Sequence, residues 1–414
     1  MTFKSSFHKS NHYKVSITVS AIFLCLGFLL QCFLGSIPKE WFAFPFNLYI
    51  GISFIVITTI LFLFFKQKDW VNLLSSVPFA LCMIVVTGVL TIGLGSFNLK
   101  PLPIEMQKPG NEFLYKMGLD NITATWYFGF FYFGLLINLW FAILKRSLIY
   151  QRKNITFLLN HFGLWLILFS GVLGQGDILR LKMTLQNDIP EWRGVDDKGH
   201  VIELPIALEL KKFKMDIYPN KLFVIDEKGE SLPKAKPDGF LLEKPNTVHQ
   251  FDKWEVTLLE YIENAVPTGE KKYSKNPMWG STNAAKISIR DKETGKKKIE
   301  WISSGNFQLP PKAVSLSKNR TLVMAPPEAK KFESELLVYQ KESDKIEKHS
   351  IYVNQPLSVD GWKIYQTSYD EKMGRWSDIS IVELVHDPWL PLVYLGIFIL
   401  MAGTFSFLIK NSKP

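Results

Sequence analysis

Cysteine is scarce in this chain. The 414 residues include only three, Cys25, Cys32 and Cys82, and all three lie in long apolar runs. The large polar part has none, so it is not a disulfide scaffold and must rely on a hydrophobic core. CxxC and CxxCH are both absent, so the chain is itself neither a thiol oxidoreductase nor a c-type cytochrome. Cys25 and Cys32 share a helix face, which suits a redox or metal pair, but we favour two small apolar residues in a helix.

The sequence also lacks the motifs of common catalytic sites. It contains no GxSxG elbow, P-loop, HExxH pair or glycine-rich dinucleotide fingerprint, so no catalytic residue is assigned. His200, His249 and His349 are scattered over the polar part without a cysteine or carboxylate at metal-ligand spacing. We interpret them as ordinary surface histidines.

Long apolar runs, by contrast, are abundant. Five lie in roughly the first 175 residues, and a sixth lies near the C-terminus. Each is about 20 residues long, which at ~1.5 Å per residue is the length that crosses ~30 Å of hydrocarbon. The sequence therefore predicts six transmembrane helices, at 15–34, 45–65, 76–95, 125–144, 155–173 and 388–408.

Basic residues in the short loops predict the orientation of these helices. The two terminal tails and the loops after the second and fourth runs carry eleven, whereas the loops on the other side carry four. Because basic loops stay in the cytoplasm, both termini are expected there and the large polar segment outside. A signal peptide is the alternative for the first run, but its apolar core is too long and no small-residue cleavage site follows.

The net charge of +10 would suit a polyanionic partner if it lay on one surface. Residues 177–387 contain 33 basic and 33 acidic residues, so the excess lies in the membrane part, where insertion explains it. The outer segment has no electrostatic footprint for nucleic acid, and we expect no nucleic-acid partner.

The segment 177–387 shows the alternation of apolar and polar residues that is typical of strands. Clusters of Pro, Gly, Asn and Asp separate the runs. An antiparallel sandwich or a barrel-like β domain is expected. Strands are predicted at 203–213, 254–262, 285–290, 335–339, 350–353, 362–369 and 379–384, a long loop at 265–282 and a hairpin turn at 292–300.

The predicted organisation has four parts. Residues 1–70 form a cytoplasmic tail and two added helices, and residues 71–176 form core helices three to five. Residues 177–387 form the extracytoplasmic β-rich domain, and residues 388–414 form the last helix and a short cytoplasmic tail. The expected fold class is an α-helical integral membrane protein with six spans and a large extracytoplasmic all-β domain.

One histidine stands inside an apolar run. His161 lies ~12 Å inside the cytoplasmic boundary of the fifth predicted helix, where an ionisable group is costly and suggests a function. Heme ligation and proton relay both suit it, but the residues alone favour a core histidine satisfied by one hydrogen bond. Trp165, one turn later on the same face, would offer an apolar wall to a porphyrin. His386, in the motif VHDPWLP where the chain re-enters the membrane, is a candidate for an outer ligand contact.

Five segments carry a resemblance to a known family. They are SSVPFALCMIVVTGVLTIGLG at 75–95, TWYFGFFYFGLLINLWFAILKR at 125–146, NHFGLWLILFSGVLGQGD at 160–177, VNQPLSVDGWKIYQTSY at 353–369 and DPWLPLVYLGIFILMAGTF at 387–405. Together they resemble the ResB family, also called CcsB-type, of system II cytochrome c biogenesis proteins. The resemblance covers about residues 70–410, and the last two segments are the most specific. Phe162 stands where the family usually has Leu, and Trp389 where it often has Gly.

The resemblance implies a membrane subunit of a heme-delivery and cytochrome c heme lyase complex, in the inner membrane with the β domain on the periplasmic side. It implies heme b in transit, bound non-covalently, with His161 as one axial ligand of the heme iron and the other ligand from a partner. The implied partners are a CcsA-type tryptophan-rich membrane protein, an apocytochrome c with CxxCH and a thioredoxin-like thiol reductase. The outer domain would guide the apocytochrome or brace the partner. Segment 353–369 is a candidate for the surface that does so, but we favour the alternative that it is a core strand and turn.

Two other functions remain open at this point. The first is an adaptor or ligand-binding membrane protein whose helices only anchor the outer domain, although inner loops of about a dozen residues leave no room for a cytoplasmic signalling domain. The second is a transporter that uses His161 as a proton relay. A transporter would usually show an internal repeat or broken helices, and neither is evident.

Overall fold

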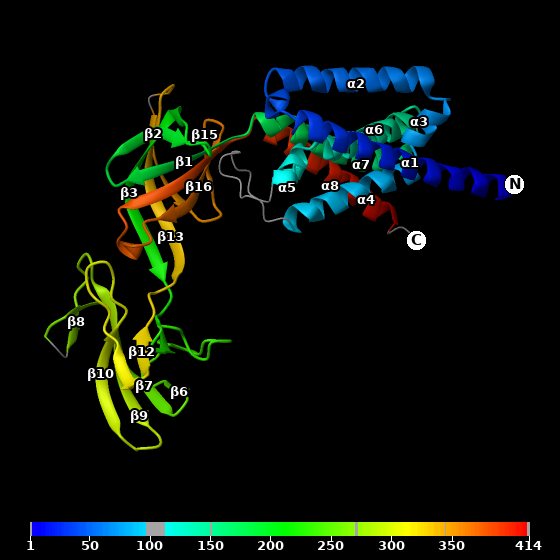
Figure 1. Ribbon diagram of the computed structural model, residues 1–414. Helices are drawn as coiled ribbons and strands as arrows, with labels where there is room; N and C mark the ends of the chain where they lie inside the picture. Colours follow the sequence, from blue (N-terminus) through cyan, green and yellow to red (C-terminus); the bar gives the residue numbers. More distant parts are fainter. Residues whose placement is uncertain (1, 97–111, 150, 270–271, 344, 412–414) are drawn as a thin grey trace. The chain divides into compact units, whose positions relative to one another are not determined.

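The computed structural model describes residues 2–96, 112–149, 151–269, 272–343 and 345–411. The chain divides into two compact units. One, the helical unit, combines Met1–Ile178 with Asp387–Pro414, and the other, the β unit, is Leu179–His386. Figure 1 shows the helices of the first unit and the strands of the second. The cytoplasmic and outer assignments of these parts stay predictions.

The helical unit contains eight α-helices within the described residues, most of them long and apolar. Its α-helices are α1 (Thr2–Leu34), α2 (Phe46–Phe65), α3 (Asp69–Leu74), α4 (Val77–Ser96), α5 (Glu112–Lys116), α6 (Trp126–Ser147), α7 (Arg152–Leu173) and α8 (Leu390–Asn411). Short 3-10 turns lie between some of them, at η1 (Lys39–Phe42), η3 (Ile122–Ala124) and η4 (Gly174–Gly176).

Within the described residues, five helices are long and apolar enough to cross a membrane. They are His12–Leu34, Phe46–Phe65, Trp126–Ser147, Asn154–Gly176 and Leu390–Ile409. The remaining predicted span, at 76–95, forms α4, but its apolar helical part, Val77–Gly93, is shorter than the other five. The chain is thus a membrane protein by the length and composition of its helices, while the count of six and the side of the termini stay predictions.

Helix α7 packs against both α6 and α8. Against α6, the buried side chains Leu136 and Leu139 meet Trp165 and Phe169 in one apolar cluster. Against α8 the contact is through glycine, because a Cβ on Gly163 would lie 2.6 Å from the backbone nitrogen of Leu400. Small residues allow such close helix packing in membranes. This packing fixes α7, and with it the backbone of His161, against α6 and α8.

Polar side chains add to the α7–α8 seam. The hydroxyls of Thr156 and Ser406 are hydrogen-bonded at 2.9 Å, and Thr404 Oγ1 donates to Asn160 Oδ1 at 3.0 Å. Hydrogen bonds between membrane helices contribute roughly 0.6 kcal/mol each on average. The two bonds therefore fix the register of the seam more than they add to its stability.

The β unit contains three antiparallel sheets. The strands are β1 (Leu179–Gln186), β2 (Pro190–Val195), β3 (Val201–Ile217), β4 (Lys221–Ile225), β5 (Gly239–Leu241), β6 (Val248–Phe251), β7 (Trp254–Pro267), β8 (Tyr273–Lys275), β9 (Thr282–Asp291), β10 (Lys297–Ser303), β11 (Val314–Ser317), β12 (Arg320–Met324), β13 (Ala329–Gln340), β14 (Lys345–Tyr352), β15 (Leu357–Val359), β16 (Trp362–Tyr369) and β17 (Ile379–His386). A 3-10 turn, η5 (Gly374–Trp376), joins β16 to β17.

The largest sheet has the order β14-β13-β3-β2-β1-β17-β16-β15; we call it the eight-stranded lobe. Its alternating inward residues form one core, which includes Leu208, Leu336 and Ile364. The sheet curls, because Ser334 Oγ on β13 donates to Ser380 Oγ on β17 at 2.9 Å although three strands, β3, β2 and β1, lie between them in the sheet order. Both serines are fully buried. The predicted barrel-like all-β domain is confirmed in this coarse form.

A second lobe is inserted between β3 and β13. It comprises β4 to β12 in sheets of five and four strands, and we call it the inserted lobe. Its core is separate from that of the eight-stranded lobe and includes Leu222, Val256 and Ile287. The sequence did not predict this division, because the strands of both lobes show the same alternation.

The β unit begins and ends at one place. Leu179, the first residue of β1, pairs with His386, the last residue of β17. The chain therefore enters and leaves this unit on adjacent strands, just as α7 and α8 lie side by side in the helical unit.

The seven strands predicted from alternation are all confirmed, with longer bounds in most cases. The predicted hairpin turn at 292–300 is confirmed between β9 and β10. The predicted long loop at 265–282 is wrong, because β7 runs to Pro267 and pairs with β8. Polar composition concealed this short hairpin. Segment 353–369 is a core hairpin, as favoured, since Val359, Trp362 and Ile364 are buried.

Candidate functional site

His161 lies in the middle of α7 and is half-buried. Its Nδ1 is 3.0 Å from the backbone oxygen of Phe157, one turn earlier. The two rings stack with centroids 3.6 Å apart, and the guanidinium of Arg146 lies 5.1 Å from the Phe157 ring. The imidazole is therefore oriented from one side by its own helix.

The bond to Phe157 has a consequence for the other ring nitrogen. A carbonyl oxygen only accepts, so Nδ1 must carry the proton, and in the neutral ring Nε2 then holds a free lone pair. None of the described residues forms a hydrogen bond with Nε2. A backbone carbonyl on one nitrogen and a metal on the other is the usual arrangement of a histidine ligand. The side chain thus fits axial ligation of a heme iron.

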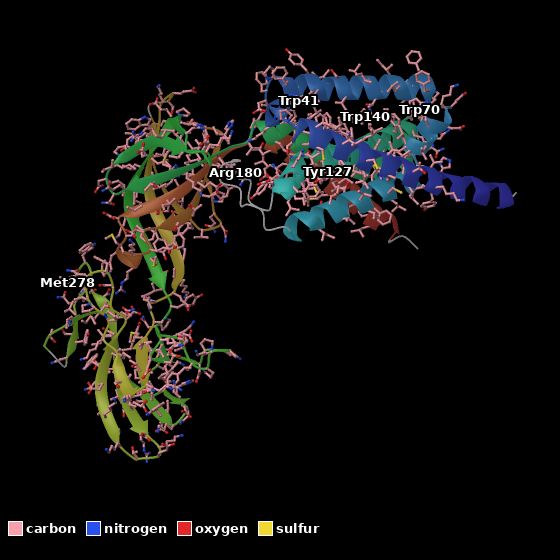
Figure 2. All side chains as sticks on the ribbon, in the orientation of Figure 1. Trp41, Trp70, Tyr127, Trp140, Arg180 and Met278 are labelled. Carbon is pink, nitrogen blue, oxygen red and sulfur yellow. The ribbon has the colours of Figure 1, made fainter. Side chains whose placement is uncertain are left out.

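Trp165 occupies a different environment from His161. It is only 2% exposed, and its rings lie 4.3 Å from Phe169 and 4.7 Å from Trp140. Trp140, labelled in Figure 2, lies on α6. The Trp165 Nε1 atom is buried and has no hydrogen-bond partner within the described part of the chain. Protein rings therefore stack on Trp165, and its contact with a porphyrin stays a prediction that would require these neighbours to move.

His386 ends β17 in the β unit. Its ring centroid lies 5.2 Å from that of Trp362 on the neighbouring strand. It also contacts the tight turn before that strand, where a Cβ on Gly361 would lie 3.4 Å from His386 Nε2. Packing against a core hairpin accounts for its position, and its contact with an outer heme stays a prediction.

The other histidines of the β unit each have a carboxylate beside them. His200 contacts Asp196, His249 contacts Asp238 and His349 contacts Glu347, each at 3.0 Å. The sequence pattern does not indicate these partners, and for His249 the fold brings in the carboxylate of Asp238 from 11 positions away. No three His, Cys, Asp or Glu side chains in the described ranges gather into a possible metal site.

A polar cluster that sequence reasoning missed lies where α2, α7 and α8 meet. Asp177 accepts hydrogen bonds from the backbone nitrogen of Phe44 at 2.6 Å, from Asn47 Nδ2 at 2.6 Å and from Trp389 Nε1 at 2.7 Å. Asn47 is fully buried and also donates to the backbone oxygen of Leu173. This Asp177 cluster ties the ends of three helices together at the point where the chain passes into the β unit. One sequence signal could have indicated this cluster. Trp389 stands where the family that the sequence resembles often has Gly, so an indole donor is present there.

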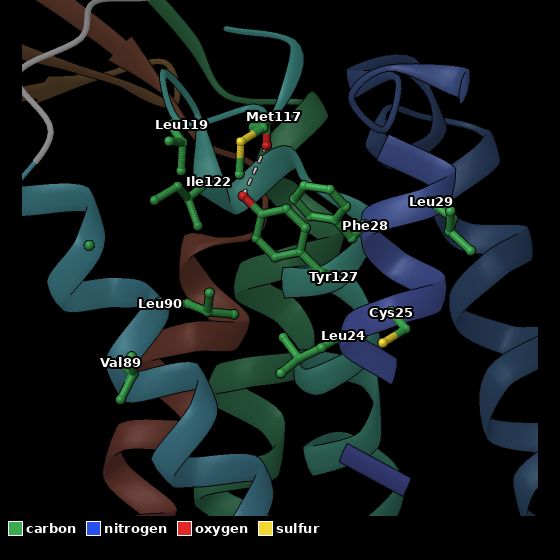
Figure 3. Close-up of a pocket in the computed structure, with 11 residues that line it drawn as sticks. Leu24, Cys25, Phe28, Leu29, Val89, Leu90, Met117, Leu119, Ile122 and Tyr127 are labelled. Atoms are coloured by element: carbon green, nitrogen blue, oxygen red, sulfur yellow. Dashed lines mark hydrogen bonds between the residues drawn. The ribbon is translucent and has the colours of Figure 1, made fainter. Parts of the chain in front are cut away.

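An apolar cavity of about 680 Å³ lies between α1, α4 and the start of α6. Figure 3 shows Phe28, Leu90 and Ile122 around it. Tyr127 lines it too, and its hydroxyl donates to the backbone oxygen of Met117 at 3.1 Å. Cys25 lies at its edge as a free thiol and is exposed, and Cys32 is also free. The lining offers no charged group to a ligand, so it is suited to hydrocarbon.

Comparison with known families finds one match. The model of the ResB-like family matches residues 285–378, from β9 to the residue before β17. This range includes the segment VNQPLSVDGWKIYQTSY at 353–369, which is one of the two segments most specific for the resemblance. The match supports assignment to the ResB family and confirms the predicted resemblance over these residues. None of the curated proteins matches the chain.

Proposed function

We propose, from the ResB-like segment at residues 285–378, that this chain is a membrane subunit of a system II cytochrome c biogenesis complex. The subunit binds heme in transit inside the membrane and supplies an extracytoplasmic β unit. The observation that carries the proposal, besides the family match, is His161. It is a membrane histidine whose Nδ1 is bonded to its own helix and whose Nε2 has no partner among the described residues.

His161 acts as a ligand in this proposal, and α7 does the positioning. The stack on Phe157 and the bond to its carbonyl hold the ring in one orientation, so little rotamer freedom is lost when Nε2 binds. Heme bound there brings a redox-active iron that must stay reduced for attachment. His161 would hold the iron of such a heme from this chain, and a CcsA-type tryptophan-rich partner would supply a second ligand.

The β unit has the supporting role. It contains no motif of a catalytic site, so the chain acts as part of a lyase rather than as the whole enzyme. We propose that it lies on the periplasmic side of the inner membrane, where it guides an apocytochrome c with CxxCH or braces the partner. A thioredoxin-like thiol reductase would keep the two cysteines of that motif reduced, because thioether bonds form from free thiols.

The test is to purify the chain with its membrane partner and record the heme absorption spectrum. His161→Gly should lower the heme content or shift the absorption maxima, and added imidazole should restore the wild-type spectrum by filling the space left by the side chain. His200→Gly is the matched control, because this exposed histidine lies in the β unit and has no place in the proposed site.

Unchanged heme content and unchanged cytochrome c maturation in His161→Gly would overturn the ligand assignment. If the β unit alone then retained partner binding, the chain would be an adaptor whose helices only anchor it. Loss of heme without imidazole rescue, together with an altered unfolding temperature, would show a structural role for His161 instead.

A further inference from the structure

Arg375 is a half-buried cation in the β unit. It belongs to η5, in the eight-stranded lobe, and its Nη2 donates to the backbone oxygen of Ser281 at 3.3 Å and to Asn283 Oδ1 at 3.1 Å. Both acceptors are uncharged and belong to the inserted lobe. No carboxylate in the described part of the chain lies within salt-bridge distance of the guanidinium, although buried charges are normally paired.

A buried network holds the guanidinium in place. Asn283 donates through Nδ2 to Asn220 Oδ1 at 2.7 Å, so its own oxygen faces Arg375. The hydroxyl of Tyr261 donates to the same Asn220 oxygen at 2.7 Å, and Asn220 Nδ2 donates to the backbone oxygen of Ala325. Burial raises the pKa of Tyr261 to about 12, so its phenol stays a neutral donor. The position of Arg375 is therefore fixed before any ligand arrives.

Arg375 is one of the residues that line a cavity of about 320 Å³. A guanidinium has five N–H groups, and the two printed bonds use those of Nη2. Nε and Nη1 have no acceptor among the residues that the structure describes. The other residues that line the cavity include Met215, Tyr369 and Met373, together with the charged pair Glu371 and Lys372. Desolvation by burial lowers the pKa of Arg375, and the charge of Glu263 acts in the opposite direction.

We propose that this cavity binds a small organic carboxylate, with Nε and Nη1 of Arg375 as donors and the methionine and tyrosine side chains against its apolar part. Charge-assisted hydrogen bonds of this kind are among the strongest that side chains form. A water molecule takes up roughly 30 Å³ in the liquid, so the cavity holds a ligand of about ten non-hydrogen atoms. That is too small for a tetrapyrrole, so the site is separate from the proposed function.

The experiment is arginine modification by phenylglyoxal on the full-length protein in detergent, read peptide by peptide by mass spectrometry. The probes are 3-phenylpropionate, its uncharged amide of the same shape, and inorganic phosphate. We expect Arg375 to react slowly but measurably, and 3-phenylpropionate at ten times its Kd to slow that reaction about tenfold by mass action. The amide and phosphate should not protect it. Arg290, an exposed residue of β9, is the internal control and should react alike in all samples.

Three outcomes would overturn the proposal. In the first, Arg375 does not react with phenylglyoxal even without ligand. In the second, 3-phenylpropionate leaves the rate of Arg375 modification unchanged. In the third, the amide or phosphate protects Arg375 as strongly as the carboxylate does. A second measurement excludes an indirect effect. The carboxylate should raise the unfolding temperature of the wild type and of Arg290→Gln, and equal stabilisation of Arg375→Gln would contradict the assignment.

Discussion

The Asp177 cluster gives a prediction whose size follows from the structure. Trp389→Phe removes one donor, the indole N–H that lies 2.7 Å from Asp177 Oδ2, and keeps an aromatic ring against Gly174. A hydrogen bond to a charged group contributes ~1.5–3 kcal/mol. Asp177 and Trp389 are both only half-buried, so solvent reduces the value to ~1–2 kcal/mol. That change corresponds to roughly a 5- to 30-fold shift in the folding equilibrium.

A double-mutant cycle isolates this bond from other effects of each substitution. Asp177→Asn alone should cost more than Trp389→Phe, because it removes the charge and its NH2 group replaces one accepting oxygen, so that it faces the donor of either Phe44 or Asn47. In the double mutant the Trp389 bond is already absent, so the two losses should not add. The expected coupling energy is ~1–2 kcal/mol. It is measured by unfolding the full-length protein in mixed micelles at increasing denaturant.

The control cycle pairs Asp177→Asn with Trp140→Phe. Trp140 also donates its indole N–H, to Thr59 Oγ1 at 3.0 Å, but it shares no partner with Asp177. These two losses should add within ~0.5 kcal/mol. Equal coupling in both cycles, or none in the first, would refute the reasoning that the Asp177–Trp389 bond joins α7 to α8.

Two further predictions concern the helix seam and the buried network. Gly163→Ala should lower the unfolding temperature of the protein in detergent, because the new Cβ would lie 2.6 Å from the Leu400 nitrogen and overpacking costs ~1–3 kcal/mol. Gly171→Ala, on the same helix with nothing within 4 Å of its Cβ, should be neutral or stabilising, and equal effects of both would contradict the close approach. The raised pKa of Tyr261, about 12, means that its contribution to stability is full below pH ~10, the ordinary pKa of tyrosine, and is lost as the pH rises toward 12. Between pH 10 and 11.5, the free energy of unfolding of Tyr261→Phe should therefore fall by ~1 kcal/mol less than that of the wild type, as measured by denaturant titrations. Parallel losses in the two proteins would show that Tyr261 is not buried as described.

The sequence by itself determined the elements of this fold. Apolar runs of about 20 residues can satisfy their backbone polar groups in a membrane only as helices, so the helices at Trp126–Ser147 and Leu390–Asn411 could be predicted from composition. Alternation of period two predicted strands such as Trp362–Tyr369 to the residue. His161 could be singled out for the same reason, because a polar group in an apolar run is visible without a structure. Local patterns were sufficient in each case.

Only the tertiary structure decided which distant residues meet. Asp177 and Trp389 are 212 positions apart, and Arg375 and Asn283 are 92 apart, so no local pattern relates either pair. The division of the β unit into two lobes was hidden for a related reason, since alternation shows which residues face a core but not which core they face. The tertiary structure also separated His161 from Trp165. His161 is half-buried, and its Nε2 has no partner among the residues that the structure describes, whereas Trp165 is stacked between protein rings. Helical spacing placed both on one face, but exposure depends on the neighbouring helices, and these are fixed by packing.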